Sequence, residues 1–317
     1  MKINIAFASD NGYVQHMGCC IASILANSRA EEQLHFYILD GGISEENKNR
    51  VEKLRQISPC EIEWLKPDMN LLKGCPIISH FSINTYLRLL LPEMLPNVDR
   101  LIYMDCDMIV TSSLAELWTT DLQGRSLGVV SEFLEYTQDE NYQRYKRDLN
   151  YEVTFNAGML LMDMTRLHES QKFRTALQWT IENAERIACA DQDALNTVFA
   201  DDCLYLPFRW NIQIRPQYVM KCLPFVKDEE VKRTLAESVG IIHYLSGEKP
   251  WHYLYYEPQR GFYWKYLQLT EWKDYRPERP KFKQRLKYFK STNPYYQAYR
   301  RFRLRVKRYF FPEKKNA

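Results

Sequence analysis

Several common signatures are absent from this sequence, and each absence excludes a class of site. The chain has no Gly-x-Gly-x-x-Gly and no Gly-Lys-[Ser/Thr], so it carries neither a dinucleotide fingerprint nor a P-loop. It has no Cys-x-x-Cys, and its eight cysteines are scattered with no secretory signal ahead of them, which argues against a zinc site and favours a reducing compartment. No apolar run approaches the ~18 residues needed to span a bilayer. A globular cytoplasmic protein is therefore expected.

Composition and charge divide the chain into two parts. With 317 residues, 45% of them hydrophobic, it can form one large domain or two smaller ones with a sizeable core. Residues 273–315 contain 16 Lys or Arg against three acidic residues, a net charge of +13, and the total of +3 leaves −10 for the rest. An acidic body thus carries a basic tail. We place the boundary near residue 250, with a domain at 1–250 and a basic, aromatic region at 251–317.

The body alternates predicted strands with predicted helices. Strands are expected at 2–8, 34–39, 61–65, 101–104, 126–131, 158–162 and 239–245. Helices are expected between the early strands, from Thr165 onward as one long helix that includes Phe173 and Ala184, and at 191–200. This alternation predicts an α/β fold with a mostly parallel sheet covered by helices on both sides.

Asp105 and Asp107 interrupt an apolar, strand-like run from Leu101 to Val110. Side chains two residues apart in a strand point to the same face, so the two carboxylates would converge. Like charges in an apolar setting repel and lose hydration unless a cation neutralises them, and a hard divalent ion does so most simply. Asp-x-Asp alone usually marks a solvated turn. Here it follows a buried strand, at the edge where open α/β sheets bind ligands, which favours a metal site.

Other candidate motifs are weak when taken singly. The turn at 7–13 follows the first strand, and the polar residues at 191–193 begin a helix, where acidic side chains also suit the helix dipole. His243 ends a late apolar strand, where a histidine is commonly structural. Together with Asp105 and Asp107 it would complete an O,O,N ligand set suited to a divalent ion that also binds phosphate oxygens. Lys249 could then meet a diphosphate as a point charge.

The order of six motifs gives these segments a joint meaning. They are Phe7–Tyr13, Tyr86–Leu89, Tyr103–Asp107, Phe155–Gly158, Asp191–Asp193, and His243-Tyr244 with Lys249–His252. In this order and spacing the chain resembles glycosyltransferase family 8, most closely its bacterial lipopolysaccharide α-galactosyltransferases and α-glucosyltransferases. The resemblance implies a GT-A fold, a Rossmann-like sheet covered by helices, that binds a UDP-sugar donor with Mn²⁺, or Mg²⁺ as the alternative, and retains the anomeric configuration.

The resemblance also implies roles for individual residues. Asp105, Asp107 and His243 would hold the metal. The nucleotide would be contacted by Ala8, Asp10, Cys106 and Lys249, and the donor sugar by Arg88, Asn156 and Asp191. Gln192 would sit near the anomeric carbon beside Asp191, where we favour stabilisation of an oxocarbenium-like state over nucleophilic attack because an amide is a poor nucleophile. His80 and Glu132 fall where relatives line the acceptor cleft.

The tail interleaves basic with aromatic and aliphatic residues at 281–290 and 300–311. A basic amphipathic segment suits an anionic membrane surface, and nucleic-acid binding or a solvated end are the alternatives. Relatives have a similar C-terminus, so the resemblance implies a peripheral protein on the cytoplasmic face of the inner membrane. No nucleic-acid partner is expected.

The resemblance, added to these patterns, implies a retaining, Mn²⁺-dependent hexosyltransferase. It would move glucose or galactose from a UDP-sugar to a hydroxyl of a lipopolysaccharide or another bacterial surface glycan. One rival is a haloacid-dehalogenase-like phosphatase with Asp105 as nucleophile, although Ile109 stands where such enzymes usually have Thr or Val. The other rival is a non-catalytic, membrane-bound glycan-binding protein.

Overall fold

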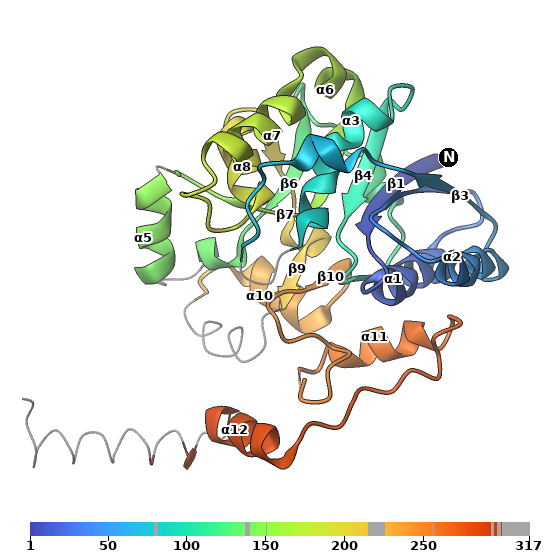
Figure 1. The fold of residues 1–317 in the computed structure, drawn as a ribbon, viewed down its shortest axis with the longest axis vertical. Helices are drawn as coiled ribbons and strands as arrows, with labels where there is room; N and C mark the ends of the chain where they lie inside the picture. The colour runs from blue at the N-terminus through green and yellow to red at the C-terminus, as the bar shows by residue number, and fades with distance from the viewer. Residues whose placement is uncertain are drawn as a thin grey trace, which may run out of the picture.

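A computed structural model describes residues 1–78, 82–136, 140–149, 151–214, 226–255, 257–292, 295–296 and 299. Its centre is a seven-stranded sheet with the order β3-β2-β1-β4-β7-β6-β8 (Figure 1). The strands are β1 (Lys2–Ser9), β2 (Gln33–Asp40), β3 (Cys60–Leu65), β4 (Arg100–Met104), β6 (Leu127–Ser131), β7 (Phe155–Asp163) and β8 (Cys203–Tyr205). Only β7 runs antiparallel to its two neighbours, β4 and β6. The predicted mostly parallel α/β sheet is confirmed.

A second, three-stranded sheet lies against the first. It consists of β5 (Met108–Val110), β9 (Ile212–Ile214) and β10 (Ile241–Tyr244), with β10 in the middle. β10 pairs antiparallel with β5, so that His243 lies opposite Met108, and parallel with β9. The only link between β4 of the large sheet and β5 of the small one is the three-residue turn 105–107.

Helices cover both faces of the large sheet. Their bounds are α1 (Val14–Asn27), α2 (Glu45–Glu52), α3 (Leu91–Met94), α4 (Ala115–Trp118), α5 (Glu140–Leu149), α6 (Met164–Ser170), α7 (Lys172–Glu182), α8 (Asp191–Val198), α10 (Glu229–Glu237), α11 (Arg260–Leu267) and α12 (Phe282–Thr292). Short 3₁₀ segments add η1 (Lys53–Gln56), η2 (Met69–Leu72), η3 (Ile83–Leu90), η4 (Phe133–Tyr136) and η5 (Phe208–Trp210). Among the described residues, no helix is both long and apolar enough to cross a membrane.

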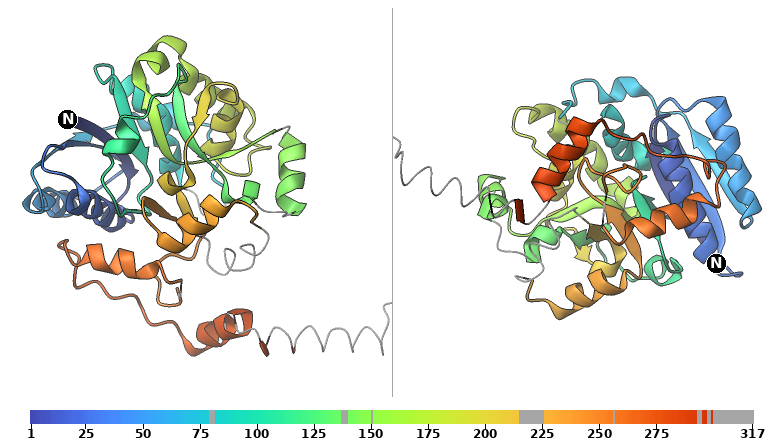
Figure 2. Two further views of the ribbon diagram at one scale, coloured as in Figure 1. Left: turned by 180° about the vertical axis from the view of Figure 1, so that it is seen from behind. Right: turned by 90° about the horizontal axis from the view of Figure 1, so that it is seen from below.

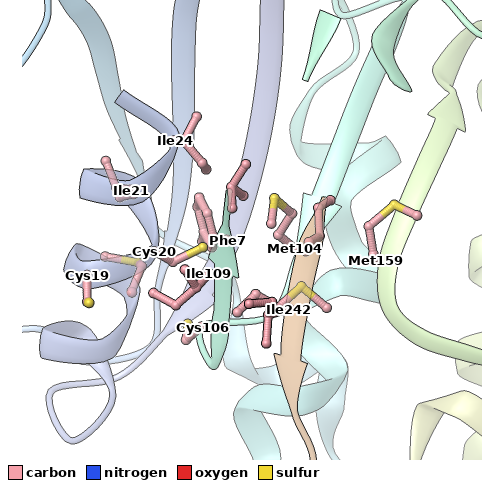
Figure 3. Packing of buried hydrophobic residues seen from close by; sticks show 14 of the residues in the cluster. Phe7, Cys19, Cys20, Ile21, Ile24, Met104, Cys106, Ile109, Met159 and Ile242 are labelled. Carbon is pink, nitrogen blue, oxygen red and sulfur yellow. The ribbon is translucent and has the colours of Figure 1, made fainter. Parts of the chain in front are cut away.

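Alternate side chains of the central strands belong to two separate hydrophobic cores, one on each face of the large sheet. Phe7 of β1 and Met104 of β4 belong to the core that also contains α1 and the small sheet. Their neighbours Ala6 and Tyr103 belong to the core on the opposite face, which contains α7 and α8. The first core includes both Met104 of β4 and Ile242 of β10, so it joins the two sheets (Figure 3). Burial on both faces explains why these strands have no polar side.

The long helix predicted from Thr165 is wrong, because the chain breaks it into α6 and α7. Gln171 adopts a left-handed conformation with φ 55° and separates the two helices. Phe173 on α7 is buried as expected. The predicted strands are all present, and 158–162 forms part of the longer β7.

Residues beyond 250 contribute to the first core. Trp251, Tyr263 and Trp272 are buried there, and α11 lies beside α1 (Figure 2). Gly18 of α1 makes room for Trp272, which follows α11, because a Cβ at that position would lie 2.6 Å from a ring carbon of Trp272. The division near residue 250 remains a prediction about domains.

Candidate functional site

Asp105 and Asp107 occupy the turn that links β4 to β5. The Asp105 N–H donates to the carbonyl of Gly158 in β7 (2.8 Å), and the Asp107 carbonyl accepts from the N–H of Tyr244 in β10 (3.0 Å). Each aspartate is therefore tied to a different sheet. The two carboxylates converge as predicted, but the cause is this turn and not the same-face rule of a continuous strand.

His243 is the third member of the group. Its Nε2 lies 3.2 Å from Asp107 Oδ1 and 3.9 Å from Asp105 Oδ2. One ligand atom from each of the three residues falls within 4.8 Å of the others. Ligands at adjacent corners of an octahedron with bonds of about 2.1 Å lie about 3 Å apart, so this O,O,N group suits a divalent cation. The predicted metal set is brought together over 138 residues of sequence, from 105 to 243.

The metal group, which consists of Asp105, Asp107 and His243, packs directly against the backbone of Gly158. A Cβ on Gly158 would lie 2.4 Å from His243 Cε1, 2.9 Å from Asp105 Oδ2 and 3.0 Å from Asn156 Oδ1. Real Cβ atoms do not approach other atoms so closely, so the metal group requires glycine here. This gives a physical meaning to the glycine of the Phe155–Gly158 motif.

Two buried cations share the three carboxylates of the site. Arg88 on η3 bridges Asp105 (Nη2–Oδ1 3.0 Å) and Asp191 (Nε–Oδ2 2.8 Å), and Lys249 Nζ lies 2.5 Å from Asp107 Oδ2. Three carboxylates and two cations sum to −1. A divalent cation would change this sum to +1, which suits an anionic ligand such as a diphosphate.

The surroundings separate the pKa values of the three carboxyl groups. Burial raises the pKa of Asp105, and Arg88 offsets this only in part. Burial acts on Asp107 in the same direction, but Lys249 and His243 outweigh it and hold the pKa of Asp107 far below its usual range. Burial raises the pKa of Asp191 to about 6, again against the influence of Arg88. Asp107 is thus the most readily ionised of the three carboxyl groups.

Asp191 and Gln192 begin α8 at the edge of the same site. Ala190 before them has φ 53° and ψ −132°, a backbone conformation that costs a non-glycine residue about 1–3 kcal/mol. The Asp191 carboxylate accepts from Thr85 Oγ1 (3.1 Å). Gln192 Oε1 accepts from the Ala157 N–H (3.1 Å) and from Asn156 Nδ2 (3.2 Å).

The turn after β1 lies next to the aspartate pair. Asp10 Oδ1 accepts from the N–H groups of Gly12 (2.9 Å) and Tyr13 (3.0 Å), which fixes the turn. The Cys106 thiol donates to the Ala8 carbonyl (3.2 Å). Ala8, Asp10 and Cys106, the predicted nucleotide contacts, therefore share one edge of the site with Lys249.

The two predicted acceptor residues have different outcomes. His80 lies outside the described residues. Glu132 is only 4% exposed, and its Oε1 accepts from Gln192 Nε2 and Asn156 Nδ2, both at 3.1 Å. The contact of Glu132 with an acceptor remains a prediction. The hydrogen bonds show that Glu132 also holds the side chain of Gln192.

Sequence reasoning missed Asn211. This side chain is fully buried and contacts both His243 and Asn156. The only signal in the sequence is a polar residue between two apolar ones, Trp210 and Ile212, which is too common to identify a site.

Comparisons with known proteins agree with this geometry. The model of glycosyl transferase family 8 matches residues 4–255. General stress protein A of Bacillus subtilis is 27% identical over 85% of this chain and 94% of its own. Lipopolysaccharide 1,2-glucosyltransferase of Escherichia coli is 26% identical over 92% of this chain and 87% of its own.

A solved structure, the galactosyltransferase LgtC in complex with donor and acceptor sugar analogues, superposes with a TM-score of 0.73 at 27% identity. The match covers 90% of this chain and all of LgtC. Asp-x-Asp alone left a phosphatase as an alternative, and the family match over residues 4–255 argues against it. The expected GT-A fold is confirmed, and the chain belongs to glycosyl transferase family 8.

Proposed function

We propose that this glycosyltransferase moves glucose or galactose from a UDP-sugar to a hydroxyl of a lipopolysaccharide or another bacterial surface glycan, with Mn²⁺ and with retention of the anomeric configuration. The observation that carries the proposal is the convergence of Asp105, Asp107 and His243 beside the turn after β1. The names of the relatives, a lipopolysaccharide glucosyltransferase and a galactosyltransferase, support the hexose and the acceptor class.

Asp105, Asp107 and His243 would hold the cation. When bound, it supplies Lewis-acid stabilisation of the charge that grows on the departing diphosphate. Lys249 Nζ lies beside Asp107 and also donates to the Tyr244 carbonyl (2.6 Å). It can therefore turn from Asp107 to a phosphate oxygen without leaving the site. No strong acid is needed to protonate the leaving oxygen.

Asp191 and Gln192 would face the donor sugar. Arg88 holds the Asp191 carboxylate at a fixed place 2.8 Å from its Nε, from which it can orient sugar hydroxyls. Both lone pairs of Gln192 Oε1 already accept hydrogen bonds, from Ala157 and Asn156, which lowers the nucleophilicity of this oxygen. These bonds favour stabilisation of an oxocarbenium-like state by Gln192 over covalent attack.

A panel of UDP-sugars tests the proposal. We expect Mn²⁺-dependent UDP release with UDP-glucose or UDP-galactose, and a loss of at least about 100-fold in kcat for Asp107→Asn. Asp201→Asn is the matched control, because the Asp201 side chain is 92% exposed, and it should retain full activity. Folded wild-type protein that releases no UDP from any donor, with or without Mn²⁺, would refute the proposed function.

The stereochemistry has its own readout. ¹H NMR of the glycoside formed from the α-linked donor should show an α-anomeric proton. A β-anomer would refute retention while leaving the transferase activity in place.

We also propose that the basic tail holds the protein on the anionic cytoplasmic face of the inner membrane. On α12, Phe282 (75% exposed) and Phe289 (53% exposed) lie seven residues apart, about two helical turns, and so share one face. Lys283 and Arg285 interleave with them. This arrangement suits an interfacial helix. The predicted segment 300–311 lies outside the described residues.

Vesicle binding tests the tail. Full-length protein should co-sediment with phosphatidylglycerol-containing liposomes at low salt, and the double variant Phe282→Ser, Phe289→Ser should bind at least tenfold more weakly while its UDP release stays unchanged. Leu269→Ser is a control, since Leu269 is 46% exposed but lies before the tail. Wild-type protein that stays in the supernatant would refute the membrane proposal.

A further inference from the structure

A chain of buried amides connects the metal group to Gln192. Asn211, fully buried before β9, lies between the two: its Nδ2 donates to Asn156 Oδ1 (2.9 Å), and its Oδ1 is 3.0 Å from His243 Nδ1. At the far end, Asn156 Nδ2 donates to Glu132 Oε1 (3.1 Å).

The backbone N–H of Gly158 determines which side-chain atom donates and which accepts in the hydrogen bonds of Asn156 and Asn211. The Gly158 N–H donates to Asn156 Oδ1 (3.1 Å), so that atom is the acceptor and the NH₂ group of Asn156 faces Glu132. An acceptor at Asn156 Oδ1 requires the NH₂ group of Asn211 on its side, which turns the Asn211 oxygen to His243. An oxygen can only accept, so His243 Nδ1 must carry a hydrogen. The remaining ring nitrogen, Nε2, then faces Asp105 and Asp107.

We propose that Asn211 is a positioning residue that holds the Nδ1–H form of His243, presents Nε2 to the metal, and ties this ligand to Gln192 through Asn156 and Glu132. The inference rests on the proposed function for the identity of the bound group. Partners behind a metal-binding histidine orient the ring and typically change metal affinity about 10–100-fold.

Every hydrogen-bonding atom of the Asn156 side chain already has its partners. Both hydrogens of Asn156 Nδ2 are used, on Glu132 and Gln192, and both lone pairs of its Oδ1 accept, from Gly158 and Asn211. A direct contact of this amide with the donor sugar, as predicted from the family, would therefore require one of these bonds to break. The structure favours an indirect role in which Asn156 holds Gln192 and Asn211 together.

Two substitutions at Asn211 distinguish its hydrogen bond to His243 from its hydrogen bond to Asn156. Asn211→Asp keeps an oxygen for His243 Nδ1–H but cannot donate to Asn156, whereas Asn211→Leu removes both bonds. We expect Mn²⁺ affinity, measured from the EPR signal of free Mn²⁺, to fall about 10–100-fold in Asn211→Leu and to be retained in Asn211→Asp. Equal affinity in wild type and a folded Asn211→Leu would overturn the proposal.

Ring nitrogen NMR of metal-free, ¹⁵N-histidine-labelled protein gives a readout that a merely structural role would not move. The His243 signal, identified by its loss in His243→Gln, should show an exchange-protected Nδ1–H in wild type and in Asn211→Asp and lose that protection in Asn211→Leu. A wild-type ring protonated only at Nε2 would overturn the assignment even if no variant folds. Protein that gives the expected spectra and affinities but turns over no UDP-sugar would refute the proposed function and leave this role of Asn211 intact.

Discussion

His16 makes folding stability depend on pH in a window that the structure defines. Its ring stacks on Trp251 with centroids 3.5 Å apart, and its Nδ1 lies 2.8 Å from the Tyr263 hydroxyl. Burial lowers the pKa of His16 from 6.5 to about 3; His252 and Lys249 act in the same direction, and Asp107 opposes them. The unfolded chain therefore takes up a proton near pH 6.5, which the folded chain does not.

The sign and size follow from this difference. Above pH 6.5 both states hold a neutral ring and His16 has no effect, whereas below pH 6.5 protonation stabilises the unfolded state and the loss continues until about pH 3. One pKa unit corresponds to 1.36 kcal/mol, so His16 should reduce the free energy of unfolding by about 1.4 kcal/mol at pH 5.5 and about 2 kcal/mol at pH 5.0, relative to pH 8.

Urea denaturation of wild type, His16→Phe and His16→Gln between pH 5.0 and 8.0 measures the effect. Phe retains a ring to stack on Trp251, and Gln can still bond the Tyr263 hydroxyl, so the two variants remove the titrating group in different ways. A lost hydrogen bond shifts the stability of a variant by a constant amount of about 1 kcal/mol at every pH. Both variants should nevertheless lose about 2 kcal/mol less than wild type between pH 8.0 and pH 5.0. Variants with the wild-type pH dependence would refute the reasoning.

Three further substitutions test other parts of the structure. Gly158→Ala, whose Cβ has no room, should weaken Mn²⁺ binding by more than tenfold in calorimetry, while Gly261→Ala, with open space around it, should not; equal affinities would contradict the packing argument. Lys249→Met removes the lysine from the Asp107 carboxylate, which keeps its contact with His243, so we expect a loss of about 3–5 kcal/mol in urea denaturation without metal and a larger stabilisation by Mn²⁺ than in wild type. An unchanged Mn²⁺ response would count against the ion pair. Ala190→Gly relieves strain and should gain about 1 kcal/mol in stability with unchanged UDP release; a destabilised variant would show that Ala190 is not strained.

The sequence predicted features that depend on local pattern and on order along the chain. Two-sided burial of β4 could be inferred from four apolar residues, and the edge rule for open sheets then located Asp105 and Asp107. The break at Gln171 could not be foreseen, because neither glycine nor proline marks it and the apolar spacing continues across it. Asn211 was missed for a different reason: its partners, His243 and Asn156, come from distant segments, and only the folded chain shows that it completes a hydrogen-bond path.

The short turn between β4 and β5 has a mechanical consequence. Asp105 follows a strand of the large sheet, whereas Asp107 directly precedes β5 at the edge of the small sheet and His243 lies on β10 at its centre. A cation held by all three would act as a non-covalent cross-link between the sheets. At a free cation concentration 100 times its Kd, this link would add about 2.7 kcal/mol to any opening that separates them. Hydrogen exchange of β5, β9 and β10 should then slow as a unit when the cation binds, because the bound cation would also stabilise the smaller sheet.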